Sequence, residues 1–287
     1  MDNQAELRAV HQDHAPEQSS TVTTGSRFAS VDGARVAYRV QGQGPAVILV
    51  NGTAALDVHW GPVIGELSKS RTVISFDYSG SGETVDDGSA LTLQKLANQV
   101  RAVAGASGLG RFDVIGHSLG AAVAVELAAT SPDLVRSLIL VAGFPWGAQP
   151  RLRLEFELWL ELLRTNRAAF LQLLLLTGLT PAFISKLGVG AVEDMVTGYM
   201  QVANWEGIER QVALDLVADI RDQSGAVTCP TLIIGCAHDQ IVTSSPELAT
   251  IIPGSVYREI NAGHLAYFEA ADEFLAAAEA FLSGERS

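Results

Sequence analysis

The sequence predicts an α/β fold, in which a mostly parallel β-sheet is flanked by helices and an all-helical cap is inserted. Two observations predict it. Short apolar segments typical of strands alternate with helical segments through most of the 287 residues, as in parallel sheets. Between residues 146 and 220 this alternation stops, and apolar residues recur at helical spacing instead. We therefore expect a core formed by residues 25–145 and 221–287, with a cap formed by 146–220.

The first strands follow a polar, aperiodic segment, residues 1–24, which we expect to be a mobile tail. Residues Arg27–Val31 and 34–40 flank an Asp-Gly pair, the pattern of a β-hairpin. The fully apolar run Ala46–Val50 is typical of a strand buried on both faces of a parallel sheet. Further along the first half, the sequence predicts strands at 72–76, 112–115 and 137–141, and helices at 92–104 and 118–129.

The second half begins with the predicted cap, where Phe156, Trp159 and Leu163 recur at helical spacing. Residues 170–180 are strongly apolar but too short to span a membrane, so they are interpreted as a buried or ligand-facing helix. An all-helical insertion between two strands is best placed over one end of the sheet. After it, the sequence predicts strands at 231–234 and Val256–Ile260, and helices at 246–251 and from about 265 to 282.

Composition restricts the class of protein. Only 18% of the residues are charged and 48% are hydrophobic, which excludes a disordered chain. A net charge of −13 without a basic stripe argues against nucleic acid and anionic membranes as partners. The N-terminal residues lack the pattern of a signal peptide, and two cysteines cannot form a disulfide framework. We expect a cytoplasmic monomer or homodimer without membrane insertion.

One serine lies in the sequence setting of a nucleophile. The predicted strand at 112–115 is followed at once by Gly116-His117-Ser118-Leu119-Gly120 and then by a helix of small residues. A G-x-S-x-G pattern between strand and helix forms a sharp turn that presents the serine hydroxyl above the sheet. The helix N-terminus beneath it favours developing negative charge. We therefore predict that Ser118 is a nucleophile.

A serine nucleophile needs a base and a group that orients the base. Of the six histidines, His264 follows the last predicted strand, which places it at the carboxyl edge of the sheet, where ligands bind in α/β folds. His238, by contrast, directly precedes a carboxylate. We therefore predict His264 as the base.

The orienting acid is expected between the serine and the base in sequence. Asp239 follows the strand at 231–234 and so reaches the same edge of the sheet. Asp215 and Asp219 lie in the predicted cap and Asp222 lies at its border, and all three are interpreted as solvated charges. Asp239 is therefore the predicted acid, which gives the chain order serine, acid, histidine.

These motifs together resemble the α/β-hydrolase family with a helical cap, from about residue 25 to the C-terminus. Besides GHSLG, residues 76–84 (FDYSGSGET) resemble the family's D-x-x-G-x-G-x-S loop. GCAHDQIV resembles its acid loop and AGHLAYFEAADEF its histidine loop. The resemblance implies two-step acyl transfer, in which Ser118 forms an acyl-enzyme, His264 transfers protons and Asp239 holds the imidazole.

The same resemblance implies an oxyanion hole. Its donors are expected to be the backbone N–H of Leu119, just after the nucleophile, and that of Thr53, in the loop after Ala46–Val50. The family usually has His-Gly in this loop, whereas this chain has Asn51-Gly52. Asn51 is interpreted as a support of the loop, and the alternative is a loop altered for unusual chemistry.

The predicted cap is rich in apolar and aromatic residues and poor in cationic ones, which favours a medium-sized apolar acyl substrate over a phosphate or polyanion. No metal-ligand pattern or dinucleotide fingerprint occurs, so neither a metal nor another cofactor is expected. The residues expected to bind substrate are Asn51, Gly52, His117, Phe144, Trp146, Trp159, Met195 and Tyr199.

The leading functional hypothesis is a serine hydrolase of an ester, thioester or lactone of a small apolar molecule. A second hypothesis keeps the same three residues but changes the outcome, to a lyase or cyclase of a specialised metabolite or to a C–C hydrolase. The family's C–C hydrolases often have a glycine-rich oxyanion loop, which NGTAALD is not. A third hypothesis is a small-molecule receptor without enzymatic activity.

Overall fold

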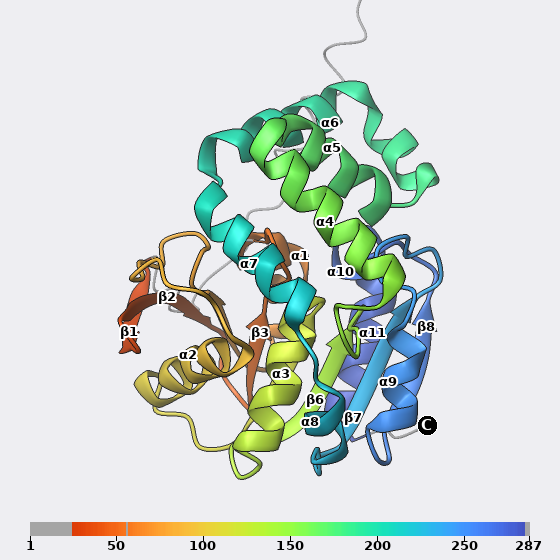
Figure 1. Ribbon diagram of the computed structural model, residues 1–287. Helices are drawn as coiled ribbons and strands as arrows, with labels where there is room; N and C mark the ends of the chain where they lie inside the picture. Colours follow the sequence, from red (N-terminus) through yellow and green to blue (C-terminus); the bar gives the residue numbers. More distant parts are fainter. Residues whose placement is uncertain (1–24, 56, 285–287) are drawn as a thin grey trace, which may run out of the picture.

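An eight-stranded β-sheet runs through the core of the computed structural model (Figure 1), which describes residues 25–55 and 57–284. The strand order is β1-β2-β4-β3-β5-β6-β7-β8, with β1, β2 and β4 paired antiparallel and every other pair parallel. The predicted fold class is confirmed, while the predicted tail lies outside the described residues. The strands are β1 (Arg27–Val31), β2 (Ala34–Gln41), β3 (Ala46–Val50), β4 (Thr72–Asp77), β5 (Phe112–His117), β6 (Val135–Val141), β7 (Thr231–Cys236) and β8 (Val256–Ile260).

Helices cover both faces of this sheet and bury two apolar clusters against it. All five residues of β3 are buried, as its continuous apolar run predicts for a strand covered on both faces. One face is covered by α2 (Leu93–Ala106), α3 (Leu119–Thr130), α8 (Arg221–Gly225) and α9 (Ser245–Ile251). The other is covered by α1 (Gly61–Leu67), α10 (Ala266–Glu269) and α11 (Ala271–Leu282).

The predicted last helix is in fact two. Ala270 has φ −130° and ψ 50°, which is not helical and separates α10 from α11. Before α1, a short 3₁₀ helix, η2 (Asp57–Trp60), continues the loop that follows β3. The break at Ala270 lets the chain after β8 turn at the carboxyl edge of the sheet before α11 packs along the sheet.

Four helices are inserted between β6 and α8, and they lie over the carboxyl ends of the strands (Figure 1). A third apolar cluster, which includes Phe156, Phe170 and Val212, joins them to the core through Ala54 and Phe144. The inserted helices are α4 (Pro150–Thr165), α5 (Arg167–Gly178), α6 (Pro181–Val202) and α7 (Trp205–Val217).

The four helices differ in how they are packed. No residue of α6 is buried, and non-helical backbone at Gly188 (φ 77°) divides it. In α7, by contrast, six residues are buried. Within residues 25–55 and 57–284, no helix has the length and apolarity needed to cross a membrane.

Candidate active site

Ser118 lies at the sharp turn between β5 and α3, with φ 53° and ψ −117°. The flanking glycines make this turn possible. A Cβ on Gly116 would lie 2.3 Å from the carbonyl oxygen of Gly120, and a Cβ on Gly120 would lie 2.2 Å from that of Val50. The Ser118 N–H donates to the carbonyl of Val141 at 2.9 Å, which ties the turn to β6. A strained serine at this place is what a nucleophile elbow requires.

His264 and Asp239 meet at the same edge of the sheet. The distance from His264 Nδ1 to Asp239 Oδ2 is 2.7 Å, and both side chains are buried. The other carboxylate oxygen of Asp239 accepts the N–H groups of Ile241 and Val242, at 2.8 and 2.9 Å. These bonds fix the carboxylate, and they direct the Nδ1–H of His264 toward it. Nε2 of a neutral His264 is then free to act as a base.

His117 supports the loop of His264. Its Nε2 lies 3.0 Å from the main-chain carbonyl of His264 and must donate, because a carbonyl only accepts. Burial, followed by the proximity of His264, holds the pKa of His117 well below its usual range, so the ring is neutral. The two rings pack edge to face with centroids 4.6 Å apart. His117 thus joins the nucleophile turn to the histidine loop.

The other candidate base and two of the other candidate acids lie away from this site. His238 is exposed, and its Nε2 lies 2.8 Å from Asn261 Oδ1. Asp219 is half-exposed and paired with Arg221, and Asp222 is exposed, as expected for solvated charges.

The prediction of a solvated Asp215 is wrong. Its side chain is 1% exposed, and its Oδ2 accepts the hydroxyl of Thr53 at 2.5 Å. Burial raises the pKa of Asp215 to about 8, so the carboxyl is largely protonated at neutral pH. The sequence places Asp215 on a helix, but only the docking of α7 against the core decides that this face is buried.

The loop between β3 and η2 runs alongside Ser118. A Cβ on Gly52 would lie 2.6 Å from Nδ1 of His117 and 3.1 Å from the Cβ of Ser118, so a larger residue would force the neighbouring side chains to shift. Asn51 donates to the carbonyl of Phe76 at 3.1 Å and accepts the indole N–H of Trp60 at 2.6 Å. Asn51 therefore anchors the loop to the end of β4 and to η2.

The two predicted oxyanion donors belong to the two segments that meet at Ser118, the loop after β3 and the start of α3. Thr53 belongs to the loop just described and lines the cavity above the serine. Leu119 is the first residue of α3, and the first N–H groups of a helix have no partner within it. Their role as donors to a reacting oxygen remains a prediction.

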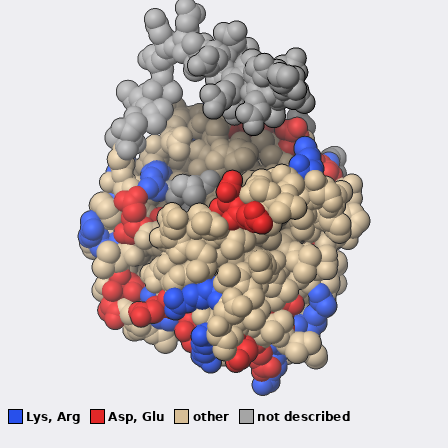
Figure 2. Space-filling view, turned by 90° about the horizontal axis from the view of Figure 1, so that it is seen from above, with Lys and Arg blue, Asp and Glu red and all other residues tan. Residues whose placement is uncertain are grey.

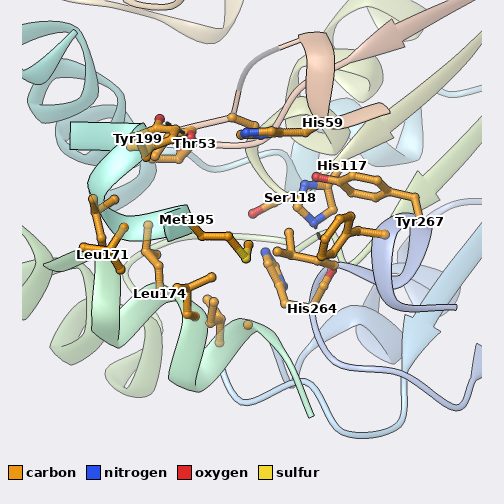
Figure 3. Close-up of a pocket in the computed structure, with 18 of the residues that line it drawn as sticks. Thr53, His59, His117, Ser118, Leu171, Leu174, Met195, Tyr199, His264 and Tyr267 are labelled. Carbon is orange, nitrogen blue, oxygen red and sulfur yellow. Dashed lines mark hydrogen bonds between the residues drawn. The ribbon is translucent and has the colours of Figure 1, made fainter. Parts of the chain in front are cut away.

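A cavity of about 510 Å³ opens between these loops and the inserted helices. Ser118, His117 and His264 gather on one side of it, while α5 and α6 supply the opposite wall (Figure 3). Among the described lining residues none is Lys or Arg, and the one carboxylate, Asp194, is exposed. On the face that carries the inserted helices, broad uncharged areas separate groups of charged side chains (Figure 2).

Comparison with known proteins identifies the family. The chain matches the model of the alpha/beta hydrolase family over residues 47–278. The chain belongs to this family. It is 42% identical over 258 residues to the pyrrolizixenacetamide deacetylase of Xenorhabdus hominickii, which covers 89% of this chain and 97% of that protein.

Solved structures agree with the fold of this hydrolase. An esterase from Exiguobacterium antarcticum superposes with a TM-score of 0.81 at 18% identity, over 90% of this chain and 99% of that one. The enol-lactonase from Burkholderia xenovorans LB400 superposes with a TM-score of 0.79 at 23% identity, over 90% and 100% of the two chains. The predicted resemblance to the α/β-hydrolase family is therefore confirmed.

Of the eight residues predicted to bind substrate in this hydrolase, the structure brings four to the cavity. Those four are His117, Trp159, Met195 and Tyr199. Asn51 and Gly52 lie in the loop between β3 and η2 but do not line the cavity. Phe144 and Trp146 do not line the cavity, because other contacts hold their side chains. Phe144 is buried against Phe156, and Trp146 lies under the Arg221 guanidinium, 4.5 Å from it.

Other lining residues of the hydrolase had weaker sequence signals. The apolar segment 170–180, expected to be buried or ligand-facing, supplies three leucines from α5. His59 belongs to no motif, whereas Tyr267 and Phe268 lie within the histidine loop but were not predicted to bind substrate. η2 and α10 bring these three residues to the cavity. The α5 leucines are Leu171, Leu174 and Leu175.

In the part of the chain that the structure describes, no cluster of three or more His, Cys, Asp or Glu side chains could hold a metal ion.

Proposed function

We propose that this hydrolase is a serine acyl hydrolase that cleaves an ester, thioester or lactone of an apolar small molecule. The observation that carries the proposal is that Ser118 and His264 line one apolar cavity, with His264 bonded to Asp239 at 2.7 Å. A nucleophile, a base and a group that orients the base are the parts that acyl transfer requires.

In the proposed reaction, Nε2 of His264 takes the proton of the Ser118 hydroxyl as its oxygen attacks the substrate carbonyl. Asp239 stabilises the imidazolium that forms. The N–H groups of Thr53 and Leu119 stabilise the negative oxygen of the tetrahedral intermediate. His264 then protonates the leaving group, which departs and leaves an acyl-enzyme. Finally His264 takes a proton from a water, whose oxygen attacks the acyl carbon. The bond from that carbon to Ser118 Oγ then breaks, the acid leaves, and His264 returns the proton to Ser118.

The cavity wall supports an uncharged, apolar substrate. The α5 leucines and Met195 face the reacting groups across a space of about 510 Å³, which suits a medium-sized molecule. No Lys or Arg is among the described lining residues, which disfavours a phosphate or a free carboxylate as the bound group. Apolar contacts therefore supply the binding energy in this proposal.

One observation favours amide cleavage as a second candidate. The relative with 42% identity is named as a deacetylase of pyrrolizixenacetamide, and an acetamide is an amide. Hydrolysis of an amide needs protonation of the leaving nitrogen, for which His264 is suitably placed after the first step. A matched pair of O-acetyl and N-acetyl compounds on one apolar scaffold separates the two candidates by their kcat/KM.

The test uses p-nitrophenyl esters from acetate to octanoate together with a fluorophosphonate probe. We expect the wild-type protein to hydrolyse the esters and to carry the phosphonate on Ser118 in peptide mass spectrometry. S118A and H264A should lose both reactions, while H238A should keep them. Absence of labelling at Ser118 would contradict the proposal and favour a receptor. Labelling without hydrolysis of any acyl compound would favour a lyase or cyclase.

A further inference from the structure

Ala54, in the loop beside Ser118, has a strained backbone that the inserted helices hold in place. Its φ is 57°, in the left-handed region that residues with a Cβ rarely adopt. Its N–H donates to Gln211 Oε1 at 3.0 Å, and its carbonyl accepts the hydroxyl of Tyr199. Next to it, the Thr53 hydroxyl donates to Asp215 at 2.5 Å. Strain of this kind persists only where the surroundings fix it.

Gln211 and Asp215 belong to α7, and α7 is seated closely on the core. A Cβ on Gly207 would lie 2.2 Å from the carbonyl oxygen of Gly80, so helix and core meet backbone to backbone. The amide nitrogen of Gln211 donates to the Ser81 hydroxyl at 2.8 Å, and its side chain is fully buried. The amide that receives the Ala54 N–H is therefore itself fixed by the core.

Asp215 is suited to hold Thr53 as a neutral group. Its Oδ1 has no hydrogen-bond partner among the described residues, and no ion pair in that part of the chain includes it. Tyr78, whose pKa Asp215 raises, is itself an acid. Burial and the Thr53 hydroxyl are the influences on the pKa of Asp215, and no cation is among them. A carboxyl without a nearby cation is protonated when buried, and then its remaining lone pairs still accept the Thr53 hydroxyl.

We infer that Gln211 and Asp215 are positioning residues of the acyl-transfer reaction, because they hold the loop that carries the Thr53 N–H at the reacting carbonyl oxygen. This inference rests on the proposed function. Neither side chain lines the cavity, so neither contacts the substrate. Removing either one should therefore slow the chemical step and leave substrate binding nearly unchanged.

The first test compares Gln211→Met with Arg210→Gln in the full-length protein. Arg210, the preceding residue of α7, binds Asp86 at 3.0 and 3.1 Å and so also joins α7 to the core, but it does not touch the loop. With p-nitrophenyl butyrate, we expect Q211M to lower kcat by about tenfold to a hundredfold, part of what one oxyanion donor contributes, with KM within about threefold. Loss of the largely buried ion pair between Arg210 and Asp86 should lower stability. R210Q should nevertheless keep kcat per folded molecule within about twofold, because Arg210 does not bond the loop.

The second test compares Asp215→Asn with Asp215→Leu. Asn keeps an oxygen that accepts the Thr53 hydroxyl, so we expect its kcat to exceed that of D215L by about tenfold or more. This pair decides the question if Q211M does not fold, which thermal unfolding of each variant reveals. A general packing role would instead lower the unfolding temperature and leave kcat per folded molecule unchanged.

Three results would overturn the inference: Q211M with wild-type kcat, equal loss in Q211M and R210Q, or equal kcat in D215N and D215L. They are distinct from failure of the proposed function, which appears already in the wild type as absent phosphonate labelling at Ser118 and absent ester hydrolysis. A wild type that hydrolyses esters with kcat insensitive to all four variants would keep the proposed function and remove the role of α7.

Discussion

The two helices α6 and α7 follow one another in the inserted segment, yet they are built very differently. In α7, Gln211 and Asp215 are buried, hydrogen-bonded and directed at the loop beside Ser118. In α6 none of the 22 residues is buried, Val189 is 75% exposed, and Met195 lines the cavity. Segments with few buried contacts open most easily. We infer that α7 supports the chemistry, while the part of α6 around Met195 shapes and admits the substrate. Tyr199, near the end of α6, is the exception, because its hydroxyl also bonds the loop at the Ala54 carbonyl.

The largest effect is expected from removing the Ser118 hydroxyl, because the roles inferred for both helices depend on this nucleophile. Ser118→Ala leaves the cavity intact but removes the nucleophile, so we expect kcat for p-nitrophenyl butyrate to fall by at least about a thousandfold. Binding of a non-hydrolysable ester analogue, measured by calorimetry, should persist. Substantial esterase activity in S118A would mean that neither helix acts through this serine.

A methyl group added at Gly207 should displace α7 from the core without changing α6. Gly207→Ala places a Cβ 2.2 Å from the backbone of Gly80, so the helix must shift. We expect kcat to fall by about tenfold or more and the free energy of unfolding to fall by about 1–3 kcal/mol. Both are measured in purified protein, by ester hydrolysis and by urea unfolding.

The matched control lies in α6. A Cβ on Gly190 would meet nothing within 4 Å, so Gly190→Ala should leave kcat unchanged. Its stability should stay equal or rise by up to about 1 kcal/mol, the helix propensity that alanine adds. Equal kcat losses in G207A and G190A would remove the distinction between the helices.

A smaller effect, on binding, is expected from the cavity side of α6. Met195→Ala removes apolar contact with the substrate, so we expect KM for p-nitrophenyl hexanoate to rise by about threefold to tenfold, with little change in kcat. Met200 lies on the same helix but does not line the cavity, and M200A should behave as the wild type. If M195A lowers kcat and leaves KM unchanged, α6 takes part in chemistry after all.

The last effect concerns the pH dependence of stability. Burial raises the pKa of Asp215 from 3.8 to about 8, so between these values the folded protein binds a proton that the unfolded chain releases. Asp215 therefore contributes most to stability at low pH, and this contribution falls as pH rises toward 8, by at most about 1.4 kcal/mol per pH unit.

Asp215→Asn removes this titration. The stability of D215N relative to the wild type, from urea unfolding at pH 5.5, 7 and 8.5, should therefore increase with pH. Asp219→Asn is the control. Asp219 is half-exposed and the Arg221 hydrogen bond lowers its pKa, so its carboxylate is ionised in both the folded and the unfolded protein across this pH range. A pH-independent difference for D215N would show that Asp215 is ionised in the folded protein.

Local chemistry explains which parts of the site could be predicted. The turn at Ser118 depends on glycines two residues away on each side, so its pattern is visible in five consecutive letters. Asp239 and His264 could be predicted because each follows a strand, and parallel strands end at one edge. The apolar run 170–180 indicated a buried or ligand-facing helix by its composition alone, and three of its leucines line the cavity.

Tertiary packing explains what could not be predicted. Asp215 has the same neighbours in sequence whether α7 is solvated or docked. Its burial depends on the docking of α7, which meets the core closely at Gly207 and Gly80. Phe144 and Trp146 were expected at the cavity because they leave a strand end, but the direction of the following turn depends on contacts distant in sequence. The positions of such side chains are decided by tertiary contacts, which the sequence pattern does not show.

The division between α7 and α6 is tested most directly by the rate of phosphonylation of Ser118, kinact, and the binding constant that precedes it, KI. Both are measured with one hexyl fluorophosphonate on the wild type, Q211M and M195A. We predict that Q211M lowers kinact by about tenfold or more with KI within about threefold, and that M195A raises KI with kinact nearly unchanged. The reverse pattern, or equal changes of both constants in both variants, would contradict it.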